Sequence, residues 1–173
     1  MAVLRFEYDV ALEQTMEFDA VYPPGLQFEL PEKRMIRQTL GAIFVWMRVD
    51  DILVGESYGV PISSYDESIE GLDDLTAPEK QNAVYCYSNT ILPPFQRRGF
   101  GDILKAHWLG LVAGKGFTTV YGHARPGASQ ALNAKFGAVF LGDFPDWYGT
   151  AETYKMYQLT LGNVSALHSG SPR

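Results

Sequence analysis

Two arginines and two glycines stand together in the middle of the chain, in the segment QRRGFG at 96–101. Apolar residues follow it with helical spacing from Ile103 onward, which predicts a helix that begins at this segment. The first N–H groups of a helix have no partners within the helix and lie at the positive end of its dipole. Because glycines let an anion approach the backbone and arginines add positive charge, the segment predicts a pyrophosphate site. A solvated turn is the alternative, since short glycine patterns are common.

A strand is expected directly before this segment. Residues 83–92 (AVYCYSNTIL) have the composition of a strand, and two prolines, Pro93 and Pro94, follow them. A proline has no N–H to donate, and it pushes the preceding residue toward extended geometry. We therefore expect pairing along this strand to stop at Leu92 and to leave main-chain peptide groups free for another partner.

A second set of residues could support a different chemistry, that of a serine hydrolase. Ser129 lies in GASQA (127–131), which follows an expected strand, opens an expected helix and approximates a nucleophile elbow. Asp143 or Asp146 and then His168 come after it in the chain order of an α/β-hydrolase. The second glycine of the elbow is missing, so a hydrolase is the remote alternative.

The composition bounds the class of protein. With 173 residues, 46% of them apolar and 20% charged, the chain suits one soluble globular domain. A signal peptide and an apolar run of about 18 residues are both missing, so we expect a cytoplasmic protein without a membrane partner. The net charge of −6 argues against nonspecific nucleic-acid binding and leaves room for a cationic substrate. One cysteine, Cys86, and three scattered histidines indicate neither an internal disulfide nor a metal site.

The N-terminal elements come next. Residues 3–8 alternate as a half-buried strand, and Asp9 could cap a first helix. Pro31 fits the first turn of a second helix. Three apolar side chains would form the inward face of that second helix: Met35, Ile36 and Leu40.

The order of the remaining elements defines the expected fold class. We expect a hairpin at 42–49 with 52–60, an acidic exposed loop at 63–80 and a strand at 83–92. A helix with its apolar stripe at 103–112, a strand at 117–123, a helix at 128–136 and two final strands at 138–143 and 153–161 follow. The order β-α-α-β-β-β-α-β-α-β-β predicts an α/β protein with a mixed sheet covered by helices. We expect one domain at 1–162 and a flexible C-terminal tail at 163–173.

This order of elements, together with QRRGFG, resembles the GNAT superfamily of acyl-CoA-dependent N-acetyltransferases, whose signature is Gln/Arg-x-x-Gly-x-Gly/Ala after the fourth strand. The likeness covers residues 3–161 in element order and is sharpest at about 88–140. It implies the GNAT fold, a central mixed, mostly antiparallel sheet flanked by about four helices. It also implies acetyl-CoA as cosubstrate, no metal, and direct acetyl transfer to a primary amine of a small molecule or a protein. A homodimer is left open, because dimers are common in the family.

The resemblance also implies which residues hold the cofactor. Seven successive backbone amides would cradle the pyrophosphate: Gln96, Arg97, Arg98, Gly99, Phe100, Gly101 and Asp102. The strand end at Ile91 and Leu92 would pair with the pantetheine arm like an added strand, and the Leu92 amide could serve as an oxyanion donor. Ser129 matches a position that can contact CoA, whereas Pro126 stands where the family pattern has asparagine.

The expected acid departs from the family pattern. Many members use a tyrosine on the late helix to protonate the leaving thiolate, and Asn133 stands at that position. An amide cannot deliver a proton, so Tyr148 and Tyr154 are the alternatives. Because of this replacement, a noncatalytic acyl-CoA-binding module is the main alternative to an enzyme.

Three residues are candidates for the general base. The spacing of histone-type members gives Tyr85 on the fourth strand, while Glu56 on the preceding strand and His123 at the end of the fifth are alternatives. A histidine has the right ordinary pKa range for this role, although a lone histidine near a strand end is more often structural. The segment 146–149 (DWYG) lies where GNAT proteins often line the acceptor pocket.

Overall fold

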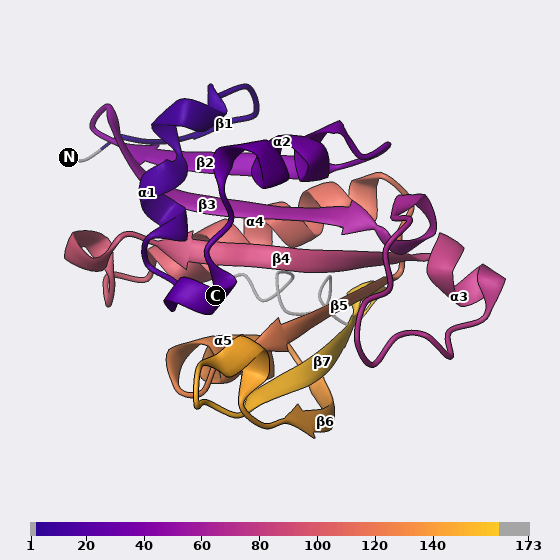
Figure 1. Cartoon of the computed structure of the whole chain (residues 1–173). Helices are drawn as coiled ribbons and strands as arrows, with labels where there is room; N and C mark the ends of the chain where they lie inside the picture. Colours follow the sequence, from indigo (N-terminus) through magenta and orange to yellow (C-terminus); the bar gives the residue numbers. More distant parts are fainter. Residues whose placement is uncertain (1–2, 163–173) are drawn as a thin grey trace, which may run out of the picture.

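A seven-stranded sheet forms the centre of the protein (Figure 1). The structure, a computed structural model, describes residues 3–162. The strands are β1 (Leu4–Glu7), β2 (Ile43–Val49), β3 (Ile52–Pro61), β4 (Ala83–Ile91), β5 (Thr119–Ala124), β6 (Val139–Phe144) and β7 (Tyr154–Thr160). They lie in the order β1-β2-β3-β4-β5-β7-β6, and every neighbouring pair is antiparallel except β4 and β5. The expected α/β class with a mixed, mostly antiparallel sheet is confirmed.

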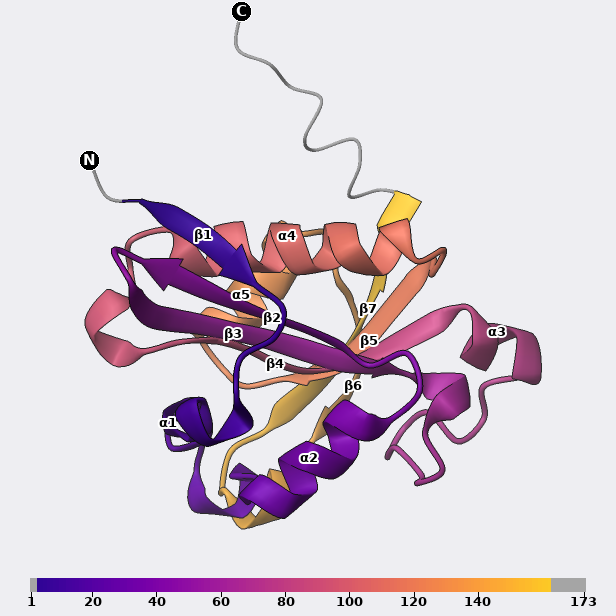
Figure 2. The ribbon, with the colours of Figure 1, turned by 90° about the horizontal axis from the view of Figure 1, so that it is seen from above.

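Helices cover both faces of the sheet (Figure 2). They are α1 (Met16–Asp19), α2 (Leu30–Gln38), α3 (Ala77–Gln81), α4 (Phe100–Gly114) and α5 (Ala128–Lys135). One core lies between the sheet and α4, and Leu132 of α5 packs at its border. A second core lies on the opposite face, beneath α1 and α2. Among the described residues no helix is both long and apolar enough to cross a membrane.

The N-terminal segment differs from the expectation. Asp9 caps no helix, because its carboxylate binds Arg37 at 2.8 Å and only short helical turns follow it. The prediction of which side chains of the second helix face inward was also partly wrong. Met35 of α2 and Leu40, just after it, are 62% and 82% exposed. Lys33 is buried there beside Ile36, which periodicity cannot anticipate because lysine counts as a surface residue.

The central hairpin is as expected. Strands β2 and β3 are joined at Asp50 and Asp51, both with positive φ (49° and 71°), as the tight turns that favour β-hairpins require. The acidic loop at 63–80 is less open than predicted. Helix α3 begins within it, and Leu72 is buried.

Candidate active site

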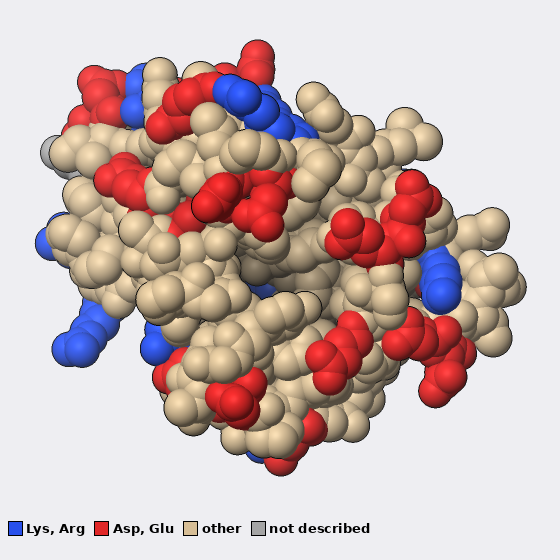
Figure 3. Space-filling view, viewed as in Figure 1, with Lys and Arg blue, Asp and Glu red and all other residues tan. Residues whose placement is uncertain are grey.

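The parallel strands β4 and β5 separate soon after they meet (Figure 1). They are paired only where residues 83–85 face residues 119–121. Beyond Tyr85, β4 runs on to Ile91 with its β3 side paired and its other edge turned toward the opening. In the space-filling view a hollow lies at the centre of this face, with Asp and Glu side chains around it (Figure 3). The fold therefore holds open a stretch of strand edge inside the molecule.

The end of the opened strand leads into the predicted anion site. After β4 the chain makes a short 3-10 turn at Pro93–Phe95, and α4 then begins with Gly99 as N-cap at φ 81°. The first helical amide bonded to a carbonyl there is that of Ile103, which donates to the Gly99 oxygen at 3.3 Å. The amides before it therefore face outward at the positive end of the helix.

The glycine at 101 is not explained by contacts within the protein. A Cβ placed there would meet only Ile91 and Leu132, each at 3.9 Å, which is ordinary contact distance. The position lies between the end of β4 and α5. Glycine here keeps space open between these elements, as a bound ligand would need.

The expectation for the Leu92 amide is contradicted. Its N–H donates to the carbonyl of Val54 on β3 at 3.0 Å, so it cannot serve as an oxyanion donor. Peptide groups alternate between the two edges along a strand, which turns those of Ile91 and Asn89 toward the opening. The Ile91 carbonyl accepts a hydrogen bond from the Gln96 side chain at 2.9 Å, which ties the loop to the strand end.

Two amide side chains on the α4 face, one half-buried and one buried, present buried polar atoms without partners. Neither polar atom of the Asn89 side chain has a hydrogen-bond partner within residues 3–162. Asn133 is buried on α5 and donates through Nδ2 to the Ser129 carbonyl at 2.9 Å, while its Oδ1 lacks a described partner. Asn133 therefore offers an acceptor to the interior. Buried polar atoms of this kind usually have a partner, and a polar ligand arm such as pantetheine fits these two.

Two of the three base candidates lie in contact on the opposite face. The Tyr85 hydroxyl lies 2.7 Å from Nδ1 of His123. The histidine ring stacks on Trp147 with centroids 4.1 Å apart and meets Phe144 edge-on. Burial lowers the pKa of His123 to about 4 and raises the pKa of Tyr85 well above its ordinary value. The imidazole is therefore neutral near pH 7, and in the tautomer with Nδ1 unprotonated it accepts a hydrogen bond from the Tyr85 hydroxyl.

The third candidate, Glu56, is buried in an ion network away from solvent. One carboxylate oxygen accepts from Lys33 at 2.8 Å and the other from Trp46 at 2.6 Å. Lys33 also binds Asp19 at 2.7 Å, so two carboxylates share one ammonium group. Burial raises the pKa of Glu56 to about 7 against the lowering effect of Lys33. With both oxygens occupied, Glu56 is not placed to take a proton from a substrate.

Two loops close over the α2 side of the opening. A Cβ at Gly25, in the segment between α1 and α2, would lie 2.4 Å from the main-chain oxygen of Tyr148. The loop between β6 and β7 holds Asp146, Tyr148 and Ala151 at positive φ, a costly backbone for residues other than glycine. Tyr148 is 65% exposed, and the buried hydroxyl of Tyr154 has no partner in the described chain.

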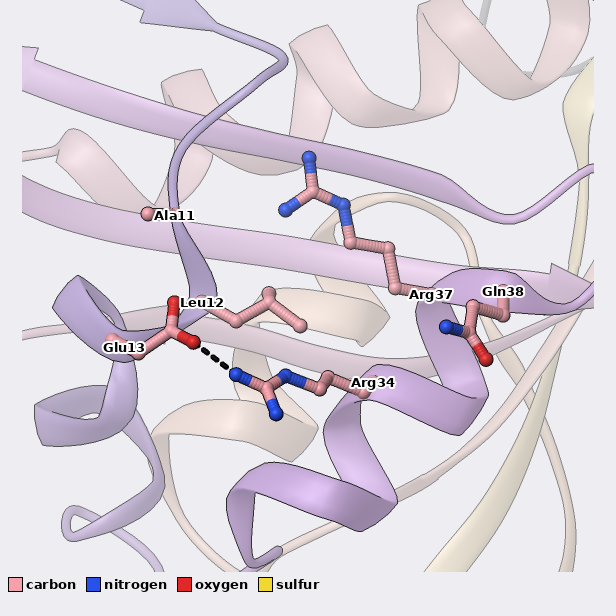
Figure 4. A pocket seen from close by; sticks show the side chains of 6 residues that line it. All are labelled: Ala11, Leu12, Glu13, Arg34, Arg37 and Gln38. Atoms are coloured by element: carbon pink, nitrogen blue, oxygen red, sulfur yellow. Dashed lines mark hydrogen bonds and ion pairs between the residues drawn. The ribbon is translucent and has the colours of Figure 1, made fainter.

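Two grooves lie along α2. One, of about 520 Å³, borders the opening through Phe28 and Tyr65, whose rings both meet Tyr87 of β4 edge-on. Its remaining lining residues are Glu32, Met35, Ile36, Gln38, Thr39, Leu40, Ser64, Asp66 and Glu67. The other, of about 480 Å³, is lined by Ala11, Leu12, Glu13, Arg34, Arg37 and Gln38 (Figure 4). It contains none of the predicted site residues.

Comparisons with known proteins identify the fold. No protein-family model and no curated protein matches the chain. The loading GNATL domain of CurA from Lyngbya majuscula has a TM-score of 0.69 at 16% identity, covering 92% of this chain and 98% of that one. The structure of yncA from Salmonella typhimurium, solved with its cofactor acetyl-CoA, has a TM-score of 0.68 at 14% identity, covering 98% of this chain and 98% of that one. The ribosomal-protein-S18-alanine N-acetyltransferase from Escherichia coli has a TM-score of 0.66 at 13% identity, covering 92% of this chain and 94% of that one. The chain therefore has the fold of the GNAT acetyltransferases.

Proposed function

We propose that this protein is an acetyl-CoA-dependent N-acetyltransferase that transfers the acetyl group directly to a primary amine. The observation that carries the proposal is the opened edge of β4, which ends at the loop where α4 begins with exposed amides. A strand edge suits an extended amide-bearing arm, and a helix N-terminus suits a pyrophosphate. The two features lie next to each other, in the order in which CoA carries these two groups.

The residues of the α4 face would hold the cofactor, which supplies an activated acetyl thioester when bound. Amides from Arg97 to Asp102 would bind the pyrophosphate, with Arg97 and Arg98 adding charge. The Gln96 amide, which the sequence included in this set, already donates to the Pro93 carbonyl at 3.3 Å. Ile91 and Asn89, in place of Leu92, would pair with the arm through their main-chain groups. The orphaned amides of Asn89 and Asn133 lie on the same face as Ile91 and would accept or donate to its polar atoms.

The residues of the α2 face would receive the acceptor. Tyr85 lies on this face with His123, and a neutral imidazole can take a proton from the attacking amine through the tyrosine hydroxyl or a water. Tyr148 and the loop around it would form one wall of the acceptor pocket. The groove with Glu32, Asp66 and Glu67 adds negative charge beside it, which favours an acceptor that carries positive charge. Lysine side chains and small polyamines both meet this description.

A noncatalytic acyl-CoA-binding module is the second candidate. It is favoured by one observation, which is that Asn133 takes the place of the usual acid and its amide nitrogen already donates to the Ser129 carbonyl. The hydrolase hypothesis has less support, because Ser129 lies on the proposed cofactor side. His168 lies outside the described residues. We further propose that residues 1–162 form one domain. The expected tail at 163–173 also lies outside the described residues.

Isothermal titration with acetyl-CoA tests the cofactor half of this proposal. Arg98→Glu should lower the affinity at least tenfold, because an exposed charge beside the pyrophosphate changes sign. Lys115→Glu is the matched control, since it makes the same charge change at the other, exposed end of α4 and should leave the affinity unchanged. Equal effects of the two variants would reject the pyrophosphate site.

A thiol-release assay against a panel of amines tests the catalytic half. Release of CoA thiol with at least one amine class would support the enzyme. Tight acetyl-CoA binding without release across the panel would favour the noncatalytic module.

A further inference from the structure

A buried lysine with an unusual environment lies on the α4 face, which is the proposed cofactor side of the sheet. Lys105 of α4 is 1% exposed, and its Nζ donates to the Tyr157 hydroxyl at 3.2 Å and lies 3.9 Å from Sγ of Cys86. Within residues 3–162 no carboxylate pairs with it. The other fully buried lysine, Lys33, binds two carboxylates. A buried ammonium group without a counter-ion is costly, so its retention calls for a role.

The cluster of Lys105, Tyr157 and Cys86 lies at the point where β4 and β5 separate. Cys86 directly follows Tyr85, the last residue of β4 that pairs with β5. On the other side, Tyr157 of β7 faces Gly122, which follows the last paired residue of β5. A Cβ at Gly122 would lie 2.6 Å from the Tyr157 hydroxyl oxygen, so glycine is needed to let the hydroxyl reach this point. Lys105 thus connects Cys86 of β4 with Tyr157 of β7 at the inner end of the opening.

The position matches where the sulfur of a bound cofactor would lie. From Ile91, at the loop, back to Cys86 the strand spans five residues, or about 17 Å. An extended pantetheine arm has about this reach. With its pyrophosphate at the start of α4 and its arm along β4, the thioester would end near the Tyr157 hydroxyl.

We propose that Tyr157 is the acid that protonates the departing CoA sulfur and that Lys105 positions it. This inference rests on the proposed acetyltransferase function, and it fills the role that Asn133 cannot take. The amine nitrogen bonds to the thioester carbon and gives one proton to the base. The carbon–sulfur bond breaks, its electron pair goes to the sulfur, and the sulfur takes the proton of the Tyr157 hydroxyl. The resulting phenolate oxygen is held by the Lys105 ammonium and recovers a proton from it or from solvent.

The hydrogen-bond directions agree with this assignment. Because Lys105 donates to the tyrosine oxygen, the tyrosine hydrogen is available to another acceptor. Burial raises the pKa of Tyr157 well above its ordinary value and lowers the pKa of Lys105, with the Cys86 thiol the other titratable group at the cluster. A thiolate at this point would pair with the ammonium and offset the cost of its burial.

The test compares CoA with desulfo-CoA, which differs only at the sulfur, by isothermal titration at pH 6 and pH 9. In the wild type, the preference for CoA over desulfo-CoA should be about tenfold greater at pH 9 than at pH 6. The reason is that an adjacent cation favours the thiolate form of the CoA sulfur and raises the acid dissociation constant of a thiol by about this factor or more. Lys105→Met should abolish this change, and Tyr157→Phe should reduce it. Cys86→Ala, which leaves both groups in place, is the control that should keep it. In thiol release, Tyr157→Phe should lower kcat about 100-fold.

Affinity for desulfo-CoA separates the outcomes. It should be the same in all four proteins, which shows an intact fold and cofactor site. If the wild type binds neither compound, the proposed function itself fails. If both bind but Lys105→Met keeps the pH-dependent preference for CoA, or if it weakens both compounds equally, Lys105 has only a structural role and the inference is overturned.

Discussion

Replacing Glu56 with glutamine should change how the free energy of unfolding varies with pH. The carboxylate is 1% exposed, and it shares the ammonium group of Lys33 with Asp19. Burial raises its pKa from 4.5 to about 7. Between these two values the folded protein keeps a proton that the unfolded chain has lost. The stabilisation from this group is therefore full below pH 4.5 and disappears as the pH rises through 7.

The magnitude follows from the difference between the folded and unfolded pKa values of Glu56. Between pH 5 and pH 8 the Glu56 contribution falls by about 2.5 kcal/mol, since a tenfold change in a proton-binding constant corresponds to about 1.4 kcal/mol. The glutamine variant cannot titrate, so it should gain about this much relative to the wild type over the same interval. Its amide has the same shape and leaves the pair of Lys33 with Asp19 intact.

Urea denaturation of both proteins at pH 5, 6, 7 and 8 measures this difference. The comparison between proteins matters because His123, whose pKa burial lowers to about 4, acts in the opposite direction and is present in both. A constant free-energy difference between wild type and variant across the four pH values would refute the account of the buried network.

Three further predictions concern the site. Gly25→Ala should raise the KM for the acceptor several-fold without changing the Kd of acetyl-CoA, because its Cβ would strike the Tyr148 main chain; an unchanged KM would contradict this. Gly101→Ala should leave the melting temperature equal or higher, because alanine favours helices, yet it should weaken the binding of acetyl-CoA about tenfold in titration. An unaltered affinity for acetyl-CoA would argue against a ligand beside α4. Tyr85→Phe should lower kcat/KM about 100-fold at pH 7 with acetyl-CoA affinity preserved, since it removes the hydroxyl on His123; a wild-type pH–rate profile would exclude it as part of the base.

Much of the fold could be predicted because its signals are local. The alternation in β7, the turn at Asp50 and Asp51 and the apolar stripe of α4 each depend on neighbouring residues. The first 40 residues were predicted less well. There Lys33 occupies the core through charges contributed by Asp19 and Glu56, and no periodicity of apolar residues reveals such a network.

The site was predicted in part for a related reason. The anion-binding loop is a local pattern, whereas the roles of single residues depend on register. A bulge in the pairing of β3 with β4 leaves Tyr87 without an opposite residue, and such an irregularity decides which peptide groups face which edge. This is why the sequence did not reveal that the Leu92 amide faces β3, where it donates to Val54. The contact of Tyr85 with His123 joins two strands 38 residues apart in sequence, which spacing alone does not show.

Amide hydrogen exchange along β4, followed by NMR with and without acetyl-CoA, tests the central claim most directly. The amides of Ile91 and Asn89 should exchange much more slowly when acetyl-CoA is bound, because they gain partners on the cofactor arm. The amide of Leu92 is the internal control, since it already donates to Val54, and it should change little. Unchanged exchange at Ile91 and Asn89 under saturating acetyl-CoA would contradict the placement of the cofactor in the opening between β4 and β5.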